Sequence, residues 1–261
     1  MLYSYIVNDK IYSYKSRLGI CENVKGKVNV ILKDTTDKFF VYQDENMVKL
    51  VSCNKNNELI YMVNNKNVWN SYTIATLNKD IAVKKIMVAS NGKNENLFYS
   101  ARLKAETVLV HCVLGNNAMP SVIGKLKNEE FYIHKNSVYF TNSNEILGYC
   151  DFLDSKPDVF TACYEGELSY VAGDKVVYKK GDDIFVNEKK YASDKHAIMP
   201  IIVNDILMWK HKTYVRYLAD NQKIRQYLSS GAEPQIFVIS DANECVYCYG
   251  TFTNGNLKLF T

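Results

Sequence analysis

A short hairpin signal recurs along the whole chain and constrains the fold more than any other feature of the sequence. Its clearest copy, Pro200–Lys212, has an apolar run, the turn pair Asn204-Asp205 and a second apolar run that contains Trp209. Asn and Asp tolerate left-handed backbone angles and hydrogen-bond to their own backbone, so such a pair favours a tight reversal between two strands. The segment therefore predicts a β-hairpin.

Six other segments repeat this pattern: the first is a near copy with the same turn pair, Asn8-Asp9, and the other five are looser versions. They are Tyr5–Lys15, Lys49–Val63, Lys85–Ala101, Glu130–Asn142, Asp158–Ala172 and Gln235–Gly250. Each of the seven copies carries one aromatic marker in its second run, namely Tyr14, Tyr61, Tyr99, Tyr139, Tyr170, Trp209 and Tyr247. The markers lie on average about 39 residues apart, a period that is typical of stacked modules or propeller blades.

The predicted strands are apolar on both faces. In Leu59–Val63 and Val108–Leu114 alternate positions on either side of the strand are mostly hydrophobic, whereas a strand with one wet face would alternate apolar with polar residues. Such strands must be covered on both sides. The blades of a propeller bury their inner strands in this way, because each blade lies between two neighbours.

This layout resembles the β-propeller superfamily across nearly the full chain, by architecture and period alone. A repeated Trp-Asp dipeptide, a kelch double glycine and a YWTD-type box are all missing, so the resemblance implies no subfamily and no functional residue. We therefore expect an all-β fold in one propeller domain over residues 1–261. Seven small blades fit best, with five or six as alternatives, and we expect the N-terminal strand to close the ring by joining the C-terminal strands in Gln235–Phe260.

The blade boundaries can also be placed from the sequence. Blade one is expected to run from Lys10 to Met47, with Lys38–Tyr42 as one of its strands. Blade four, Glu129–Pro157, has room for little more than three strands, and the segment Asp158–Ala172 is expected to open blade five as a hairpin. For residues 220–231 the propeller register favours a strand over a short helix.

Composition narrows the class of protein. Hydrophobic residues make up 47% of the 261-residue chain, so a large core is expected. There is no signal-peptide pattern at the N-terminus and no run of 18 apolar residues, so we expect no membrane insertion. Seven scattered cysteines favour a reducing compartment, here the cytoplasm, over a disulfide framework. The net charge is only +4 and the basic residues are dispersed, so no nucleic-acid partner is expected.

The familiar motifs of catalysis and metal binding are not found. Cys245 and Cys248 form the single CxxC, without the second pair that a zinc site usually needs, and core cysteines explain them more simply. There is no HExxH, no GxSxG and no phosphate-binding glycine loop. We therefore predict no catalytic residue, no metal site and no cofactor.

Acidic residues nevertheless recur at the predicted hairpin turns. They are Asp9, Glu165, Asp205 and Asp241, and His134 lies at another such turn. If these turns gather at one mouth of the ring, the five side chains become candidates for ligand binding, and paired carboxylates would suit glycosidic acid–base chemistry or a cation. The preference of Asp and similar residues for turns accounts for the same pattern without a function.

The sequence thus predicts a non-enzymatic binding or scaffolding propeller that presents one ring face to a protein or glycan partner. Two alternatives stay open. One is a glycan-active hydrolase or lyase with carboxylates at the channel mouth, and the other is a structural component of a larger assembly, which should self-associate. The ligand, the functional face and the oligomeric state are not encoded in any pattern that we recognise.

Overall fold

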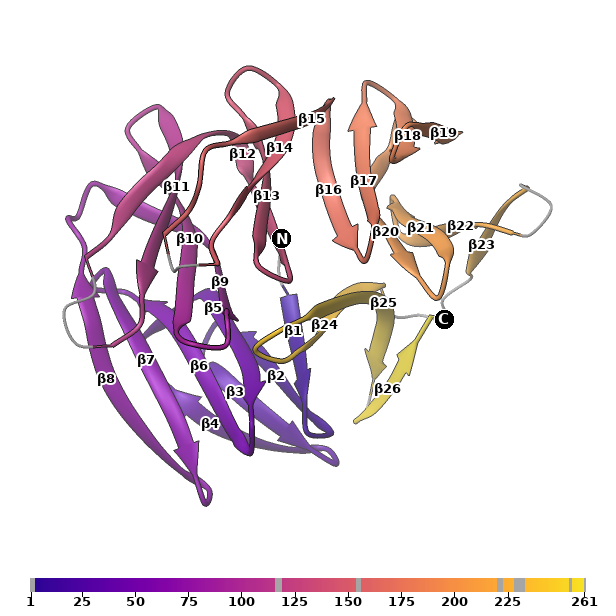
Figure 1. Cartoon of the computed structure of the whole chain (residues 1–261). Coiled ribbons are helices and arrows are strands. Elements are labelled where there is room, and N and C mark those ends of the chain that lie inside the picture. The colour runs from indigo at the N-terminus through magenta and orange to yellow at the C-terminus, as the bar shows by residue number, and fades with distance from the viewer. Residues whose placement is uncertain are drawn as a thin grey trace.

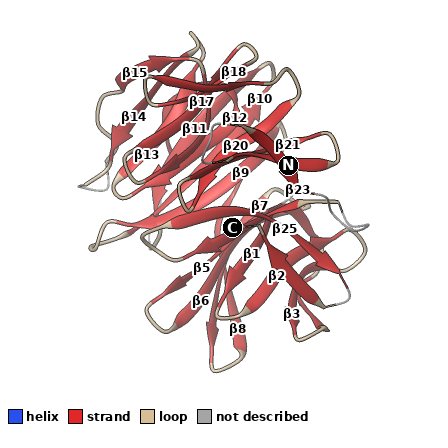
Figure 2. Ribbon diagram, turned by 90° about the vertical axis from the view of Figure 1, so that its right-hand side faces the viewer, coloured by secondary structure: helices blue, strands red, loops and turns tan. Residues whose placement is uncertain are grey.

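The computed structural model describes residues 3–115, 119–153, 156–219, 223–227, 233–253 and 255–260, and every regular element in these ranges is a β-strand. The strands form three four-stranded and two seven-stranded sheets, which follow one another around a ring, and nearly all neighbouring strands are antiparallel (Figure 1). The view from the side shows strands and connecting loops throughout (Figure 2). Within the described residues there is no helix that is long and apolar enough to cross a membrane.

The first three blades follow the order of the chain. Blade one contains β1 (Tyr3–Val7), β2 (Lys10–Lys15), β3 (Gly19–Val24) and β4 (Lys27–Leu32). Blade two contains β5 (Thr35–Asp44), β6 (Met47–Asn54), β7 (Glu58–Asn65) and β8 (Val68–Thr76). Blade three contains β9 (Ile81–Ser90), β10 (Glu95–Leu103), β11 (Glu106–Val113) and the first half of β12 (Ser121–His134).

The remaining four blades continue around the ring. Blade four contains the second half of β12, then β13 (Ser137–Asn142), β14 (Ile146–Asp151) and β15 (Thr161–Glu165). Blade five contains β16 (Glu167–Ala172), β17 (Lys175–Lys180), β18 (Asp183–Val186) and β19 (Lys189–Ser193). Blade six contains β20 (Ala197–Val203), β21 (Ile206–His211), β22 (Tyr214–Leu218) and β23 (Ile224–Tyr227). Blade seven contains β24 (Gln235–Ser240), β25 (Cys245–Thr253) and β26 (Asn256–Leu259).

Strand β12 belongs to two blades. Its residues 121–126 pair with β11, residues 131–134 pair with β13, and the register breaks between Leu126 and Phe131. A break of this kind bends a strand and redirects it, so β12 leaves the outside of blade three and becomes the inner strand of blade four. With this division the described residues form seven antiparallel units, which agrees with the predicted seven-bladed propeller.

The two ends of the chain join in one sheet. Strand β1 pairs in parallel with β24, with Tyr3 opposite Ile236 and Ile6 opposite Ile239. This confirms the expected closure, which leaves neither strand with an open inner edge. Strand β1 also pairs with β2 and so begins blade one.

Two predicted blade boundaries were wrong. Blade one does not extend to Met47, because Lys38–Tyr42 lies in β5, which pairs with β6 and opens blade two. Blade four has a fourth strand, β15, which pairs with β14. At both positions the predicted repeat is displaced by one strand from the repeat in the structure.

Six of the seven predicted hairpins are present. Asn8-Asp9 and Asn204-Asp205 both have positive φ angles of 47° to 64°, as the tight turns of such hairpins require. The exception is Asp158–Ala172, whose two strands, β15 and β16, belong to different blades. The expected strand in residues 220–231 is found as β23, whereas residues 220–222 and 228–232 lie outside the described ranges.

Burial follows distance from the centre of the ring. In β11 the five residues Val108–Cys112 are buried on both faces, as predicted. In β7 Leu59 and Met62 are buried, but Ile60 and Tyr61 are only partly covered. The outer strands β4 and β8 are mostly exposed, because two neighbouring blades diverge towards the rim and no longer cover each other there.

Candidate functional site

Tyrosine side chains from four blades meet at the centre of the ring. Tyr3 comes from β1, Tyr132 from β12, Tyr170 from β16 and Tyr247 from β25. The ring of Tyr247 packs edge-on against the other three, with centroid distances of 5.3 to 5.8 Å. Side chains from blades one, four, five and seven can all meet only near the axis, so aromatic rings fill the central channel at this level.

A buried ion pair lies beside this tyrosine cluster. The Lys85 side chain, from β9, is only 5% exposed, and its Nζ lies 2.7 Å from Oε2 of Glu130 in β12. The same ammonium lies 3.8 Å from the centre of the Tyr132 ring, close enough for a cation–π interaction. Tyr3 donates its hydroxyl to the same Glu130 oxygen at 3.2 Å.

The Glu130 carboxylate is held in its charged form. Burial alone would raise its pKa, but the charge of Lys85 and hydrogen bonds from Lys85 and Tyr3 outweigh burial and lower the pKa. Burial in turn lowers the pKa of Lys85, and the Glu130 charge opposes that shift. The Glu130 side chain remains 31% exposed. It therefore presents a negative charge to a ligand in the space next to its exposed side.

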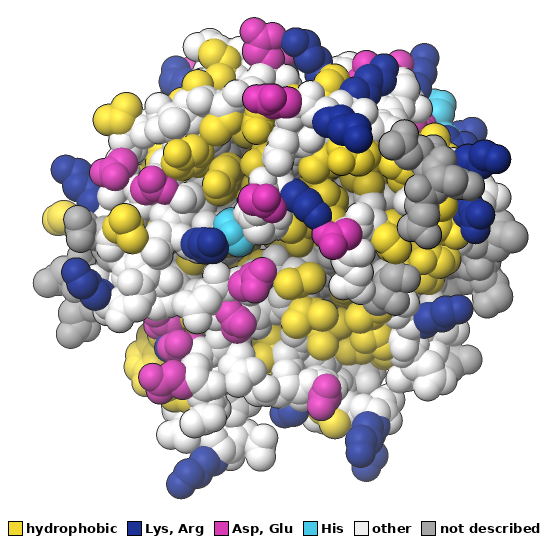
Figure 3. Space-filling model, turned by 45° about the vertical axis from the view of Figure 1, so that its right-hand side comes forward, with side chains coloured by type: hydrophobic (Ala, Val, Ile, Leu, Met, Phe, Trp, Pro, Cys, Tyr) yellow, Lys and Arg dark blue, Asp and Glu magenta, His cyan; other side chains and the backbone are white. Residues whose placement is uncertain are grey.

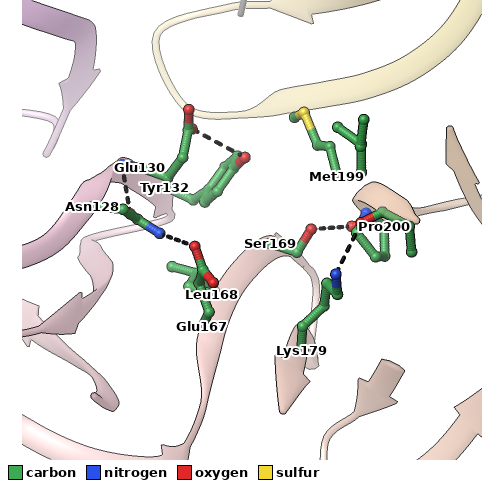
Figure 4. A pocket seen from close by; sticks show the side chains of 11 residues that line it. Asn128, Glu130, Tyr132, Glu167, Leu168, Ser169, Lys179, Met199 and Pro200 are labelled. Atoms are coloured by element: carbon green, nitrogen blue, oxygen red, sulfur yellow. Dashed lines mark hydrogen bonds between the residues drawn. The ribbon is translucent and has the colours of Figure 1, made fainter. Parts of the chain in front are cut away.

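That space is a pocket of about 270 Å³ at one mouth of the ring (Figure 4). Strand β12 contributes Glu130 and Tyr132 to its lining, strand β16 contributes Glu167, and the start of β20 contributes Met199 and Pro200. Three blades, four to six, thus form one concave site, and its segments are far apart in the sequence.

Hydrogen bonds between strands hold the pocket walls together (Figure 4). Asn128 donates its side-chain amide to the Glu167 carboxylate at 2.5 Å and joins blade four to blade five. Ser169 donates to the carbonyl oxygen of Pro200 at 2.7 Å, and Lys179 donates to the carbonyl oxygen of Ala197 at 2.9 Å. The pocket is therefore formed before any ligand arrives, as is usual for binding sites.

One wall of the pocket contains a strained residue. Met199 has a φ of 47° at a register break in β20 between Ile198 and Ile201. Such a backbone angle is unfavourable for a residue that has a Cβ atom. Tyr249 stabilises the distortion, because the carbonyl oxygens of Ile198 and Met199, at 3.0 and 2.8 Å, share the hydrogen bond that its hydroxyl donates. The Ile198 side chain is left 44% exposed at the pocket.

A second pocket, of about 430 Å³, continues the first between blades four and five and shares Glu167 and Lys179 with it. Gly166 forms part of its lining, with a φ of 144° and no room for a Cβ, which would lie 2.7 Å from the carbonyl oxygen of Lys179. Ion pairs flank this part, with Lys180 2.9 Å from Glu165. We call the two connected pockets the mouth groove.

Four of the five sequence-predicted residues lie at one end of the blades, and the fifth, Glu165, lies at the other. Asp9, Asp205 and Asp241 lie on the turns β1–β2, β20–β21 and β24–β25, and His134 ends β12 at the turn that leads to β13. Glu165 lies opposite Ile146, at the far end of the blade-four strands from His134. It is therefore the one of the five that lines the mouth groove.

The residues at the hairpin-turn end have local roles. Asp205 pairs with Lys175 of the neighbouring blade. Asp241 accepts hydrogen bonds from the backbone N–H groups of Asn243 and Glu244 at 2.7 and 2.8 Å, an arrangement that stabilises its own turn. Nε2 of His134 is buried and has no hydrogen-bond partner among the residues that the structure describes, and burial lowers the pKa of this side chain.

Metal ligands are not clustered in the described part of the chain, where no group of three or more His, Cys, Asp or Glu side chains is placed to hold an ion. Cys245 is half-buried and Cys248 is buried, and both thiols are free. Core packing therefore accounts for the CxxC segment.

Sequence reasoning missed the residues that build the mouth groove. The sequence analysis does not identify Lys85 and Glu130, although the pair Lys84-Lys85, with hydrophobic residues on either side in a predicted strand, is a signal that one lysine has a buried partner. Glu167 and Met199 carry no sequence signal of this kind. They become neighbours only because blades four, five and six are packed together.

Comparisons with known proteins support the fold. No family model and no curated protein matches the sequence. Among solved structures, KlHsv2 with loop 6CD replaced by a Gly-Ser linker has a TM-score of 0.57 at 12% identity, covering 100% of this chain and 97% of its own. The AfRom2 CNH domain has 0.57 at 7% identity, with coverages of 98% and 92%. The WD40 β-propeller domain of Doa1 has 0.54 at 10% identity, with coverages of 88% and 83%. The chain is thus a β-propeller without an assigned subfamily.

Proposed function

We propose that this β-propeller is a non-enzymatic binding or scaffolding protein that docks a segment of a protein partner in the mouth groove. The observation that carries the proposal is the combination of an open, preformed groove with a filled channel behind it. Because tyrosines close the axis, a ligand at this mouth would contact the ring face and would not pass through the ring.

The chemistry of the groove favours a peptide segment. Glu130 and Glu167 place negative charge next to the exposed Ile198 and to Met199. A peptide with a basic and an apolar side chain would therefore contact a carboxylate with the first and a hydrophobic side chain with the second. The Lys180–Glu165 pair is exposed, and such surface pairs are weak, so a partner would displace it at little cost. Tyr132 is almost fully buried, which leaves its ring without the open face that stacking with a sugar needs.

The surface around the ring is also of mixed character. On the face that Figure 3 shows, basic and acidic side chains are interspersed and hydrophobic side chains lie between them. Protein-binding surfaces combine apolar and charged groups in this way. The pattern gives no support to a nucleic-acid partner, which would call for a basic stripe.

The alternative of a glycan-active enzyme finds one supporting feature, since two carboxylates, Glu130 and Glu167, line the same pocket. A glycosidase needs one carboxyl group with a raised pKa to protonate the leaving oxygen. The charge of Lys85 lowers the pKa of Glu130, which makes Glu130 unsuited to that role. The binding function therefore accounts better for the site.

Peptide selection tests the proposal. Random 15-residue peptides displayed on phage would be enriched on the immobilised protein, and the enriched peptides would be synthesised for affinity measurements. We expect Glu167→Lys and Ile198→Glu to weaken their binding at least about tenfold, as for central residues of an interface. Ile239→Glu is the matched control, because Ile239 is 45% exposed, against 44% for Ile198, and lies at the hairpin-turn end of β24.

Two results would overturn the proposal. Enrichment of no peptide, or of peptides that bind Ile198→Glu as well as they bind the unchanged protein, would remove the mouth groove as the docking site. Turnover of aryl glycosides that disappears in Glu130→Gln would favour the enzyme instead.

We also propose a reducing, cytoplasmic location. All seven cysteines are free and five of them are buried, which fits the prediction from the sequence.

A further inference from the structure

A second concave site lies on the opposite side of the ring from the mouth groove. It has a volume of about 670 Å³ and is formed by the outer strands of blades one and two. Lys25 and Asn67, which line it, belong to the turns β3–β4 and β7–β8. Strand β1 runs from Tyr3, near the mouth groove, to the turn at Asp9. Ile11 follows that turn and pairs with Asn23, which precedes the β3–β4 turn. These turns therefore lie at the end of the blades that is away from the mouth groove. We call this site the rim groove.

An aromatic ring is held rigidly on one side of the rim groove. Trp69 in β8 is half-buried, and its ring meets the Tyr12 ring edge-on at a centroid distance of 6.5 Å. Tyr12 is fully buried, and its hydroxyl donates to the Glu22 carboxylate at 3.1 Å. The orientation of Trp69 is therefore fixed by the core of blade one, and a fixed ring binds a flat apolar surface at little entropic cost.

Polar groups that suit hydroxyl ligands surround the ring. The Glu22 carboxylate accepts hydrogen bonds from Lys10 at 2.8 Å and from Asn29 at 3.5 Å. Because 3.5 Å is at the limit of a hydrogen bond, the Asn29 amide is free to turn to a ligand. The side chain of Asn67 also lines the groove. Carboxylate and amide groups together can accept from and donate to neighbouring hydroxyls.

The charge of the rim groove is unbalanced. Lys10, Lys25 and Lys27 face a single acid, Glu22, which is paired with Lys10. No ion pair to Lys25 or Lys27 is found within the described ranges of the chain, and both side chains are exposed. A ligand with a negative group would therefore gain two cations at the groove entrance.

We infer that the rim groove binds an acidic saccharide, that is, a sugar chain with a carboxylate. The apolar face of one sugar ring packs on Trp69, its hydroxyls bond to Glu22, Asn29 and Asn67, and its carboxylate lies near Lys25 and Lys27. An acidic peptide fits less well, because the Glu22 charge at the groove floor repels it, whereas a sugar hydroxyl donates a hydrogen bond to Glu22.

The intrinsic fluorescence of the protein supplies the test. The chain has two tryptophans, and Trp209 is fully buried, so a ligand-dependent change reports on Trp69. The probes are galacturonate, glucuronate and sialyl oligosaccharides, with maltotriose and lactose as neutral counterparts. We expect at least one acidic probe to change the emission, to bind at least about tenfold more tightly than its neutral counterpart, and to bind more weakly as salt is raised.

Variants then locate the site. Lys27→Gln, at an exposed position that does not endanger the fold, should weaken binding about threefold or more and reduce its salt dependence. Trp69→Phe removes the fluorescent reporter, so its affinity is measured by titration calorimetry and should be lower than that of the unchanged protein. Tyr72→Ala is the matched control, because Tyr72 is a 60% exposed aromatic residue on the same strand that does not line the rim groove, and it should bind as the unchanged protein does.

The inference is overturned if none of the acidic probes binds, if Lys27→Gln and Trp69→Phe leave their affinity unchanged, or if hexaglutamate binds more tightly than the saccharides at the same residues. Each result is independent of the mouth groove, since the peptides selected there should bind the two rim-groove variants, Lys27→Gln and Trp69→Phe, normally.

Discussion

The ammonium group of Lys85 lies 2.7 Å from the carboxylate of Glu130, and this pair joins blade three to blade four next to the tyrosines on the ring axis. A buried pair is costly to form, but removal of one partner is more costly because it leaves an uncompensated charge. The pair therefore links the stability of the ring to the electrostatics of the mouth groove, where the other side of Glu130 is exposed.

Lys85→Met should destabilise the protein by about 3 kcal/mol, because Glu130 is then left partly buried without its cation. The free energy of unfolding in urea measures the effect. Lys85→Met/Glu130→Gln should recover part of the loss. Lys175→Met, which removes a surface pair with the exposed Asp205, is the control and should cost less than about 1 kcal/mol. A Lys85→Met protein as stable as the unchanged one would contradict this account of the pair.

Asp194 makes the stability of the propeller sensitive to acid. Burial alone would raise its pKa, but hydrogen bonds from Trp209, the His196 backbone, His211 and Arg216 outweigh burial and lower the pKa to about 2. A lowered pKa in the folded state stabilises the protein above the normal value near 4, and this contribution is lost as the pH falls towards 2. The free energy of unfolding should therefore decline over that interval.

Asp194→Asn should make that decline shallower. It should also cost about 1–3 kcal/mol at neutral pH, because one of the two acceptor oxygens becomes an NH2 donor and Arg216 loses its negative partner. Tryptophan fluorescence in urea at pH 2 to 7 follows both effects. Equal slopes in the variant and the unchanged protein would show that other carboxylates cause the acid sensitivity.

Much of the fold could be predicted because its determinants are local. Turn pairs such as Asn204-Asp205 adopt left-handed angles wherever they occur, and hydrophobic residues on both faces identify strands that are covered on both sides, such as β11. The predicted count agrees with the seven antiparallel units of the described residues, even though two markers, Tyr61 in β7 and Tyr170 in β16, lie outside the second strand of their units. Each marker still lies in a different blade.

The errors have a physical cause. Glu165-Gly166 looks like a hairpin turn, but Gly166 has a φ of 144° and connects two blades. The mouth groove could not be predicted, because Glu130, Glu167 and Met199 meet only through the packing of three blades. The prediction for the turn acids used only their local sequence. A local preference for turns is also what Asp241 shows, because its carboxylate stabilises its own turn.

The seven thiols should differ strongly in reactivity. Cys163 is the exposed one, whereas burial raises the pKa of Cys112 and Cys150 to about 11, which leaves little thiolate at neutral pH. With a disulfide reagent such as DTNB we expect a fast phase of about one thiol in the native protein, lost in Cys163→Ser, and all seven thiols in denaturant. Fewer than seven would show a disulfide and would contradict the proposed reducing location.

Gly166→Ala should damage both the fold and the mouth groove. A φ of 144° is accessible almost only to glycine, and the added Cβ would lie 2.7 Å from the carbonyl oxygen of Lys179, so a loss of about 3 kcal/mol is expected. Gly173→Ala is the matched control, because Gly173 also has a positive φ but has open space around its Cβ position, at the other end of β16. It should cost about 1 kcal/mol.

The two variants also distinguish an effect on stability from an effect on peptide binding. Because Gly166 lines the mouth groove and Gly173 does not, the peptides selected on this face should bind Gly166→Ala more weakly and Gly173→Ala normally, when both proteins are measured well below their unfolding transitions. If Gly166→Ala binds them normally, the peptide occupies only the pocket above Glu130, and the part of the groove between blades four and five is not used.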